Sequence, residues 1–187
     1  GGFQKGGFDA ASDSSITISG GTIHINASGD GVDSNGDFVV TGGETYVSGP
    51  TDSGNGFLDY AGEATISGGI FVAIGSSGMA QNFGDSSAQG AMLVSVSGSA
   101  NDVITLKDSS GKELLSWTAD KAFDCVVISC PEIKQGETYT VTAGSSSQEV
   151  TMDSLIYGSG GMGGGSGNQG GRPSDKGDRP SDRGSRP

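Results

Sequence analysis

The sequence has little positive charge, and this limits the partners it can bind. Arginine occurs only after Gly171, and no lysine lies between Lys5 and Lys107. Residues 1–157 therefore carry 19 acidic and 5 basic side chains. Such a surface repels nucleic acid and anionic membranes and lacks the basic stripe that phosphate binding requires. It suits cations or neutral partners, and we expect no nucleic-acid partner.

Long apolar runs and a signal peptide are also missing. Without an apolar run of about 18 residues, no membrane insertion is predicted. Since the sequence also does not begin with methionine, we expect it to be a segment of a longer chain. The two cysteines, Cys125 and Cys130, occur in "CVVISC". In an extended strand they would be about 16 Å apart on opposite faces, so we predict two buried thiols and no disulfide.

Glycine is abundant, and much of it follows a repeat. The pattern "ITISGGTIHIN" at 16–26 returns as "FVVTGGETYVS" at 38–48 and "ATISGGIFVAI" at 64–74. The glycine pairs are 22 and 26 residues apart, a spacing typical of solenoid repeats. Alignment on the pairs gives columns of residues expected to point inward: Ile18/Val40/Ile66, Ile23/Thr45/Phe71 and Ile25/Val47/Ala73.

The apolar residues change parity at each glycine pair. Ile16 and Ile18 occupy even positions, whereas Ile23 and Ile25 occupy odd ones. We predict that each pair forms a two-residue corner, which turns one strand into the next and keeps both apolar faces inward. Units of strand, corner, strand and loop predict an all-β fold, a parallel β-helix. A β-sandwich of hairpins is the alternative.

Three regions are expected along the chain. Residues 1–100 hold the parallel coils. Residues 101–157 lack the Gly-Gly signature and read as further strands, for example in "DVITLKDSSGKELLSWTA", that continue or cap the solenoid. Residues 158–187 contain no apolar side chain except Met162 and predict a disordered tail.

A second column consists of aspartates that each follow an apolar residue: Asp9, Asp33 and Asp59. If the apolar residues point inward, the carboxylates point outward and stack about 4.8 Å apart. Like charges at this spacing destabilise the fold unless a cation compensates them, and Ca²⁺ prefers such oxygen ligands. Neighbouring loops offer three more candidate ligands: Asp30, Asn35 and Asn55. The structural alternative is that these residues only form turns.

Three side chains are candidates for carbohydrate binding, because a flat ring matches the apolar face of a pyranose. Tyr46 is expected on the outer face of the coils and Tyr60 on the loop side. His24, the only histidine, shares the outward column of Tyr46. Ordinary exposed side chains are the alternative for all three.

The segment from Ile16 to Gln81 resembles a family of secreted bacterial carbohydrate-binding domains. The resemblance covers Gly7 to about Ala143 and rests on the Gly-Gly repeats, "SGPTDSGNGFLDY" and "GSSGMAQ". It implies a right-handed, single-stranded parallel β-helix similar to polysaccharide lyases, with further coils before Gly7. It also implies binding of calcium and of plant cell-wall polysaccharides such as cellulose and polygalacturonate.

These observations leave three classes of function. We favour a monomeric, extracellular or cell-surface module that binds polysaccharide through calcium and has no catalytic residues. The second class is a lyase or hydrolase on the same scaffold. A lyase needs a basic residue near calcium, and the repeats offer only Lys5, whereas a hydrolase needs two carboxylates. The third class is a structural or adhesive surface repeat in which calcium serves stability alone.

Overall fold

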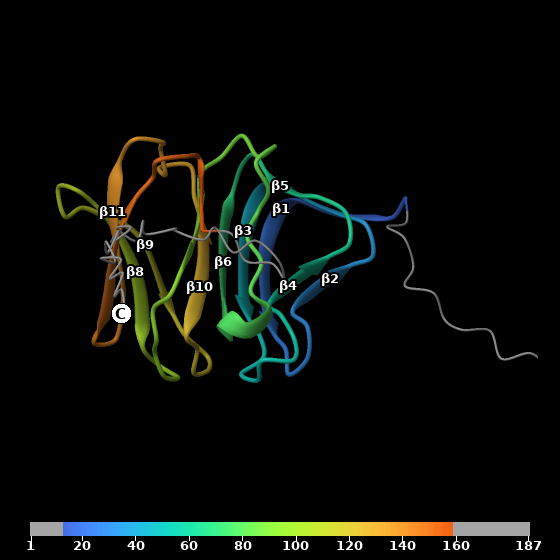
Figure 1. Cartoon of the computed structure of the whole chain (residues 1–187), viewed down its shortest axis with the longest axis horizontal. Coiled ribbons are helices and arrows are strands. Elements are labelled where there is room, and N and C mark those ends of the chain that lie inside the picture. The colour runs from blue at the N-terminus through green and yellow to red at the C-terminus, as the bar shows by residue number, and fades with distance from the viewer. Residues whose placement is uncertain (1–12, 159–187) are drawn as a thin grey trace, which may run out of the picture.

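The computed structural model describes residues 13–158 and shows an all-β protein (Figure 1). Residues 1–12 and 159–187 lie outside the described part, and with them Asp9 and all of the predicted tail except Gly158. One short 3₁₀ turn, η1 (Ser77–Met79), interrupts the strands. Within residues 13–158, no helix has the length and apolar character needed to cross a membrane.

The largest sheet has seven strands and joins both halves of the described chain. Its strands are β1 (Ser15–Asn26), β3 (Asp37–Ser48), β5 (Ala64–Ile66), β6 (Ile70–Gly75), β7 (Ala91–Val94), β10 (Cys125–Ser129) and β13 (Ile156–Tyr157). β1, β3 and β6 are parallel neighbours, and β5 pairs with β3. β10 then lies antiparallel between β6 and β7. The sheet is therefore mixed, with parallel pairing among β1, β3, β5 and β6 and between β7 and β13, and antiparallel pairing on both sides of β10.

A small parallel sheet of β2 (Val32–Ser34) and β4 (Leu58–Tyr60) lies opposite the first strands of the large sheet (Figure 1). The first core fills the space between them, and Phe38, Phe57 and Phe71 are fully buried there. The predicted inward columns are confirmed, since Val40 pairs with Ile66 and both are buried. These strands stack by burying apolar residues between successive chain passes.

The first two glycine pairs lie inside strands and form bulges, so the predicted corner is wrong there. β1 and β3 continue through their pairs, and the β1–β3 ladder shifts register next to Ser19. The third pair, Gly68–Gly69, forms a bend between β5 and β6. The second glycine of each pair, Gly21, Gly43 or Gly69, has a φ of +82°, +83° or +84°. Because a bulge adds an unpaired residue, it changes the face on which the following side chains lie. The parity change thus arises within a strand at the first two pairs and between two strands at the third.

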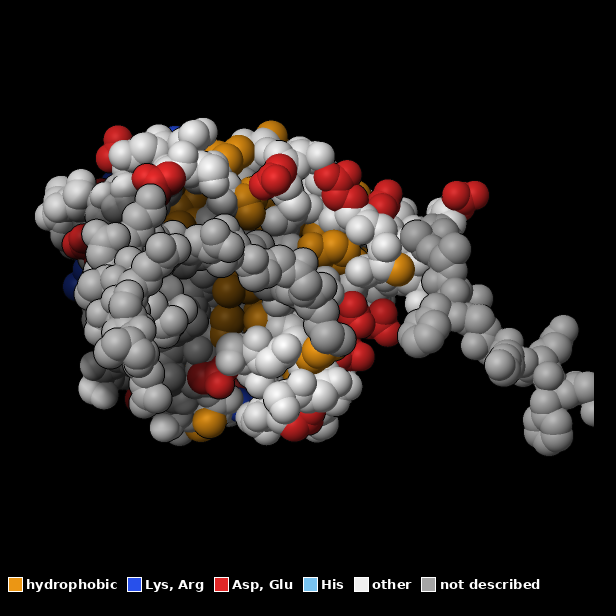
Figure 2. Space-filling model, in the orientation of Figure 1, with side chains coloured by type: hydrophobic (Ala, Val, Ile, Leu, Met, Phe, Trp, Pro, Cys, Tyr) orange, Lys and Arg blue, Asp and Glu red, His pale blue; other side chains and the backbone are white. Residues whose placement is uncertain are grey.

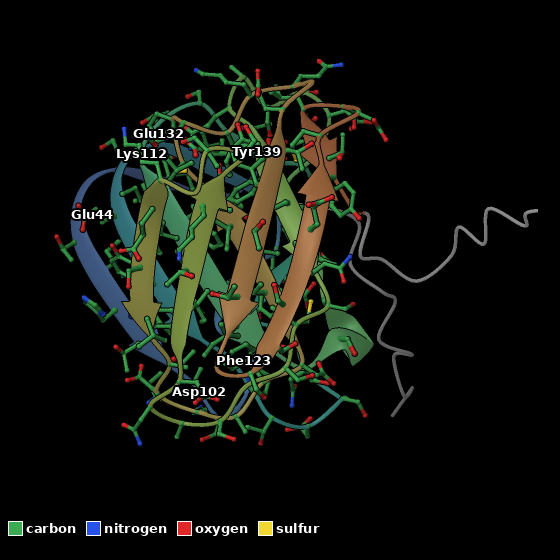
Figure 3. The ribbon with its side chains drawn as sticks, turned by 90° about the vertical axis from the view of Figure 1, so that its left-hand side faces the viewer. Glu44, Asp102, Lys112, Phe123, Glu132 and Tyr139 are labelled. Carbon is green, nitrogen blue, oxygen red and sulfur yellow. The ribbon has the colours of Figure 1, made fainter. Side chains whose placement is uncertain are left out.

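An antiparallel four-stranded sheet covers the outer face of the large sheet on its C-terminal side. Its strands are β8 (Val103–Asp108), β9 (Glu113–Thr118), β11 (Thr138–Ala143) and β12 (Ser146–Thr151). Figure 3 views this sheet from outside. Val72, Met92 and Ile128 of the large sheet meet Ile104, Leu106 and Val141 of the four-stranded sheet in a second core.

The large sheet is thus shared by two cores. In β10, Cys125 and Val127 face the first core, whereas Val126 and Ile128 face the second. Cys125 and Cys130 are both free and buried, one in each core. The prediction of two separate buried thiols is therefore confirmed.

Candidate functional site

Two of the predicted calcium ligands lie side by side on the small sheet. Asp33 pairs with Asp59 across β2 and β4, while Val32 and Leu58, one position earlier, are buried in the first core. Parallel strands lie about 4.8 Å apart, so the two carboxylates project from neighbouring positions. The register predicted from the sequence is confirmed for this pair.

A third carboxylate, that of Asp30, interacts electrostatically with Asp59 of this pair. Its Oδ1 accepts a hydrogen bond of 2.9 Å from the backbone N–H of Gly56, which fixes it beside the next chain pass. Partial burial raises the pKa of Asp59, and the carboxylates of Asp30 and Asp33 raise it further. We call Asp30, Asp33 and Asp59 the acidic edge. Figure 2 shows acidic side chains gathered over β2 and β4 without a lysine among them in that view.

The other two predicted ligands are placed differently. Asn55 is half-buried, and its Nδ2 donates to Oδ1 of Asp52 over 3.3 Å, an interaction within one turn. Asn35 is exposed in the turn between β2 and β3. Among residues 13–158, no three His, Cys, Asp or Glu side chains form a ready metal-binding cluster. The acidic edge thus brings carboxylates close enough to influence one another without forming a complete set of metal ligands.

The aromatic candidates on the outer face form a row of stacked rings. The rings of His24 and Tyr46 have centroids 5.0 Å apart and planes 19° apart, and Trp117 of β9 lies 5.5 Å from Tyr46 at 32°. Since 5.0 Å matches the strand spacing, the first two rings stack across the strands and do not lie flat on the sheet. The hydroxyl of Tyr46 donates to Oε2 of Glu44 over 3.2 Å. Tyr46 thus presents its edge and hydroxyl to solvent more than a ring face.

Exposure along this outer column decreases where the four-stranded sheet begins. His24 of β1 is exposed, Tyr46 of β3 is half-buried, and Val72 of β6 is fully buried in the second core. Trp117 stands at the rim of that core, against Tyr46. The outer faces of β1 and β3 consequently form a shelf beside the edge of β9.

Tyr60 lines a cleft of about 220 Å³ near the acidic edge. Asn82, Phe83, Asp85 and Ile156 form the remaining walls. The Tyr60 hydroxyl donates to the carbonyl oxygen of Asn82 over 2.7 Å, which fixes the ring. Burial, followed by the charges of Glu63 and Asp59, raises the pKa of this hydroxyl. The cleft thus combines a fixed aromatic ring with neighbouring carboxylates.

Sequence reasoning missed two residues that reach the coils from far along the chain. Trp117 extends the aromatic row, and Lys121 donates from Nζ to the carbonyl oxygens of Ala27 and Gly49. Trp117 could have been singled out as the only tryptophan, but its position beside Tyr46 depends on pairing between distant strands. No local pattern marks Lys121, which is 94 residues from Ala27.

We compared the chain with protein-family models, curated proteins and solved structures. No protein-family model matches the chain, no curated protein matches it, and no solved structure matches it.

Proposed function

We propose that this protein binds plant cell-wall polysaccharide, of the cellulose or polygalacturonate type, through calcium and without catalysis. The observation that carries the proposal is the pairing of Asp33 with Asp59 beside Asp30. A cation beside Asp59 would offset the repulsion that the carboxylates of Asp30 and Asp33 exert on its ionised form. Ca²⁺ accepts six to eight oxygens in flexible geometry, so an open edge leaves positions for ligand oxygens.

Calcium would also explain how an acidic protein holds an acidic polymer. The chain has a net charge of −12, which repels a polyuronate. A divalent cation held by Asp33 and Asp59 offers its open positions to carboxylates of the polymer and so joins two negative partners. Tyr60 follows Asp59 directly in sequence, so the cleft that Tyr60 lines would then hold a sugar ring beside the ion. Tyr46 and His24 would contribute ring edges and polar groups on the shelf.

We further propose that the parallel strands are coils of a right-handed parallel β-helix. The repeated register of β1, β3 and β6, the matching pair of β2 and β4, and the shared positive φ of Gly21, Gly43 and Gly69 support this. Such a scaffold suits long polymers, because successive coils repeat one surface along the axis. An extracellular or cell-surface location would fit, since extracellular calcium sites work at about 10⁻⁴–10⁻³ M.

A hydrolase is the second candidate, and the raised pKa of Asp59 beside Asp33 favours it. Retaining glycosidases use two carboxyl groups about 5–5.5 Å apart, one of them protonated. Asp59 is only partly buried, however, and the acids of glycosidases owe their raised pKa to apolar pockets. Among residues 13–158, the lysine that reaches the parallel strands is Lys121, and its ammonium group is held by two carbonyl oxygens, which disfavours the lyase alternative.

Affinity electrophoresis tests the proposal. Gels containing polygalacturonate, a cellulose-type polymer or no polymer are run with calcium and with chelator. We expect retardation that depends on calcium in the polygalacturonate gel and is largely lost in Asp33→Asn. The matched control is Asp153→Asn, an exposed aspartate far along the chain in a turn before β13. Calcium-dependent stabilisation without retardation would show a structural repeat, and release of reducing sugar would show a hydrolase; either result would refute the proposal.

A further inference from the structure

A cleft of about 380 Å³ opens at one end of the four-stranded sheet. It lies between the β8–β9 turn and the connection from β10 to β11. Figure 3 shows Lys112, Glu132 and Tyr139 together at this end, with Asp102 and Phe123 at the other. The volume falls in the range of about 300–1,000 Å³ that small-molecule sites occupy. Because Lys112 and Lys134 both line it, we call it the lysine cleft.

One wall of the lysine cleft is a turn fixed by a carboxylate. Oδ1 of Asp108 accepts from the backbone N–H and the hydroxyl of Ser110, over 2.9 and 2.6 Å, and from the backbone N–H of Lys112 over 3.0 Å. These hydrogen bonds, led by that of the Ser110 hydroxyl, lower the pKa of Asp108. The Asp108 carboxylate thus holds the turn through Ser110 and the backbone N–H of Lys112, and the Lys112 ammonium group takes no part in these hydrogen bonds.

The opposite wall is anchored to a buried ring. The Tyr139 side chain is 2% exposed, and its hydroxyl accepts from the backbone N–H of Lys134 over 2.7 Å. The same hydroxyl donates to the carbonyl oxygen of Glu132 over 2.9 Å. Both walls are therefore fixed before a ligand arrives, which reduces the entropy lost on binding.

Both signs of charge line the lysine cleft, from the two lysines and from three carboxylates: Asp108, Glu132 and Glu137. Lys112 and Lys134 are exposed, and the charge of Lys112 also acts on the Asp108 carboxylate. Two ammonium groups attract the carboxylate of a ligand. Glu132 and Glu137 supply acceptors for hydroxyl groups, and Leu114 supplies an apolar contact. A carboxylate, several hydroxyls and an apolar ring face occur together in a hexuronate.

We propose that the lysine cleft binds one hexuronate residue of an acidic polysaccharide directly, without calcium. Its carboxylate would lie at the ammonium groups of Lys112 and Lys134, and its hydroxyls at Glu132 and Glu137. This inference rests on the proposed function, which supplies the polymer. It adds a second contact on a different sheet from the acidic edge, so a bound chain would be held at two separate places.

The test uses small probes that cannot be bridged to the acidic edge. Galacturonate and galactose are titrated into the whole protein in excess chelator, and binding is followed by NMR chemical shifts and calorimetry. We expect galacturonate to shift the amides of Ser110, Lys112 and Lys134, and galactose to bind more weakly. Lys112→Gln and Lys134→Gln should each weaken galacturonate binding by about five- to tenfold, the loss of one charge-assisted contact.

Lys107→Gln is the matched control, because it removes the same charge from β8 outside the cleft. It should leave galacturonate binding unchanged. No galacturonate binding in chelator, equal affinity for galactose, or unchanged binding in both cleft variants would each overturn the proposal. Calcium-dependent retardation by polygalacturonate tests the acidic edge separately, and Lys112→Gln and Lys134→Gln should retain it.

Discussion

The glycine bulges allow backbone conformation and stacking between coils to be measured separately. Gly21 and Gly43 have nearly the same φ, +82° and +83°. A Cβ at Gly21 would meet nothing within 4 Å, whereas a Cβ at Gly43 would lie 2.7 Å from the carbonyl carbon of Gly20 and from the carbonyl oxygen of Gly21. Alanine at either position must adopt an unfavourable positive φ. Only Gly43→Ala would also place its Cβ against the backbone of the neighbouring strand.

The magnitudes follow from this comparison. A non-glycine residue in the left-handed region costs about 1–2 kcal/mol, which is the whole effect expected for Gly21→Ala. Gly43→Ala adds overpacking against backbone that cannot move aside, about 1–3 kcal/mol more. For a domain of this size, each kcal/mol corresponds to a fall in melting temperature of about 2–4 °C.

The first glycines of the first two pairs allow the cost of packing to be measured without the cost of a positive φ. A Cβ at Gly20 meets open space, whereas one at Gly42 would lie 2.8 Å from the carbonyl oxygen of Ser19. Neither residue has a positive φ. Gly20→Ala should therefore be nearly neutral, and Gly42→Ala should show the stacking cost alone.

Urea unfolding of the four alanine variants, followed by circular dichroism, measures these free energies. The expected order of destabilisation is Gly20, then Gly21 and Gly42, then Gly43. If Gly43→Ala were no less stable than Gly21→Ala, the close packing of Gly43 against Gly20 and Gly21 would be refuted.

Three further predictions concern titratable groups and activity. Because the pKa of Asp59 is raised, its stabilising contribution is fully present below the ordinary value of 3.8 and is lost as pH rises through the raised value. In chelator, the Asp59→Asn variant should not lose this stability as pH rises. Melting temperatures of parent and variant that change with pH in parallel would contradict the prediction. Burial raises the pKa of Cys125 and of Cys130 to about 12, so a thiol reagent at neutral pH should react with both only after denaturation; rapid reaction of the native protein would refute this. Incubation with polygalacturonate and calcium should release no unsaturated product absorbing in the near ultraviolet, whereas sustained release by pure protein would show a lyase.

The sequence predicted what depends on local repetition. The glycine pairs gave the register of β1, β3 and β6, and the Val-Asp and Leu-Asp motifs gave the pairing of Asp33 with Asp59. The first two glycine pairs form bulges where the sequence predicts corners, because a corner and a bulge produce the same parity change. Only φ and the continuity of the ladder distinguish the two.

What the sequence could not predict depends on contacts between distant segments. "CVVISC" reads as a strand, but nothing in it specifies insertion between β6 and β7. The position of Trp117 against Tyr46 and that of Lys121 against the first loops follow from the same long-range pairing. The lysine cleft likewise joins two turns that are more than 20 residues apart.

The insertion of β10 has a consequence for how the chain folds. β7 has two partners in the large sheet, β10 and β13, and both follow it by at least 30 residues. Until residues 125–129 have been synthesised, one edge of β6 and the whole of β7 therefore have no partner strand. Such late, non-local pairing slows folding, because loops must close before contacts compensate their entropy. A chain released or cleaved before Cys125 would expose that edge and would be prone to aggregate.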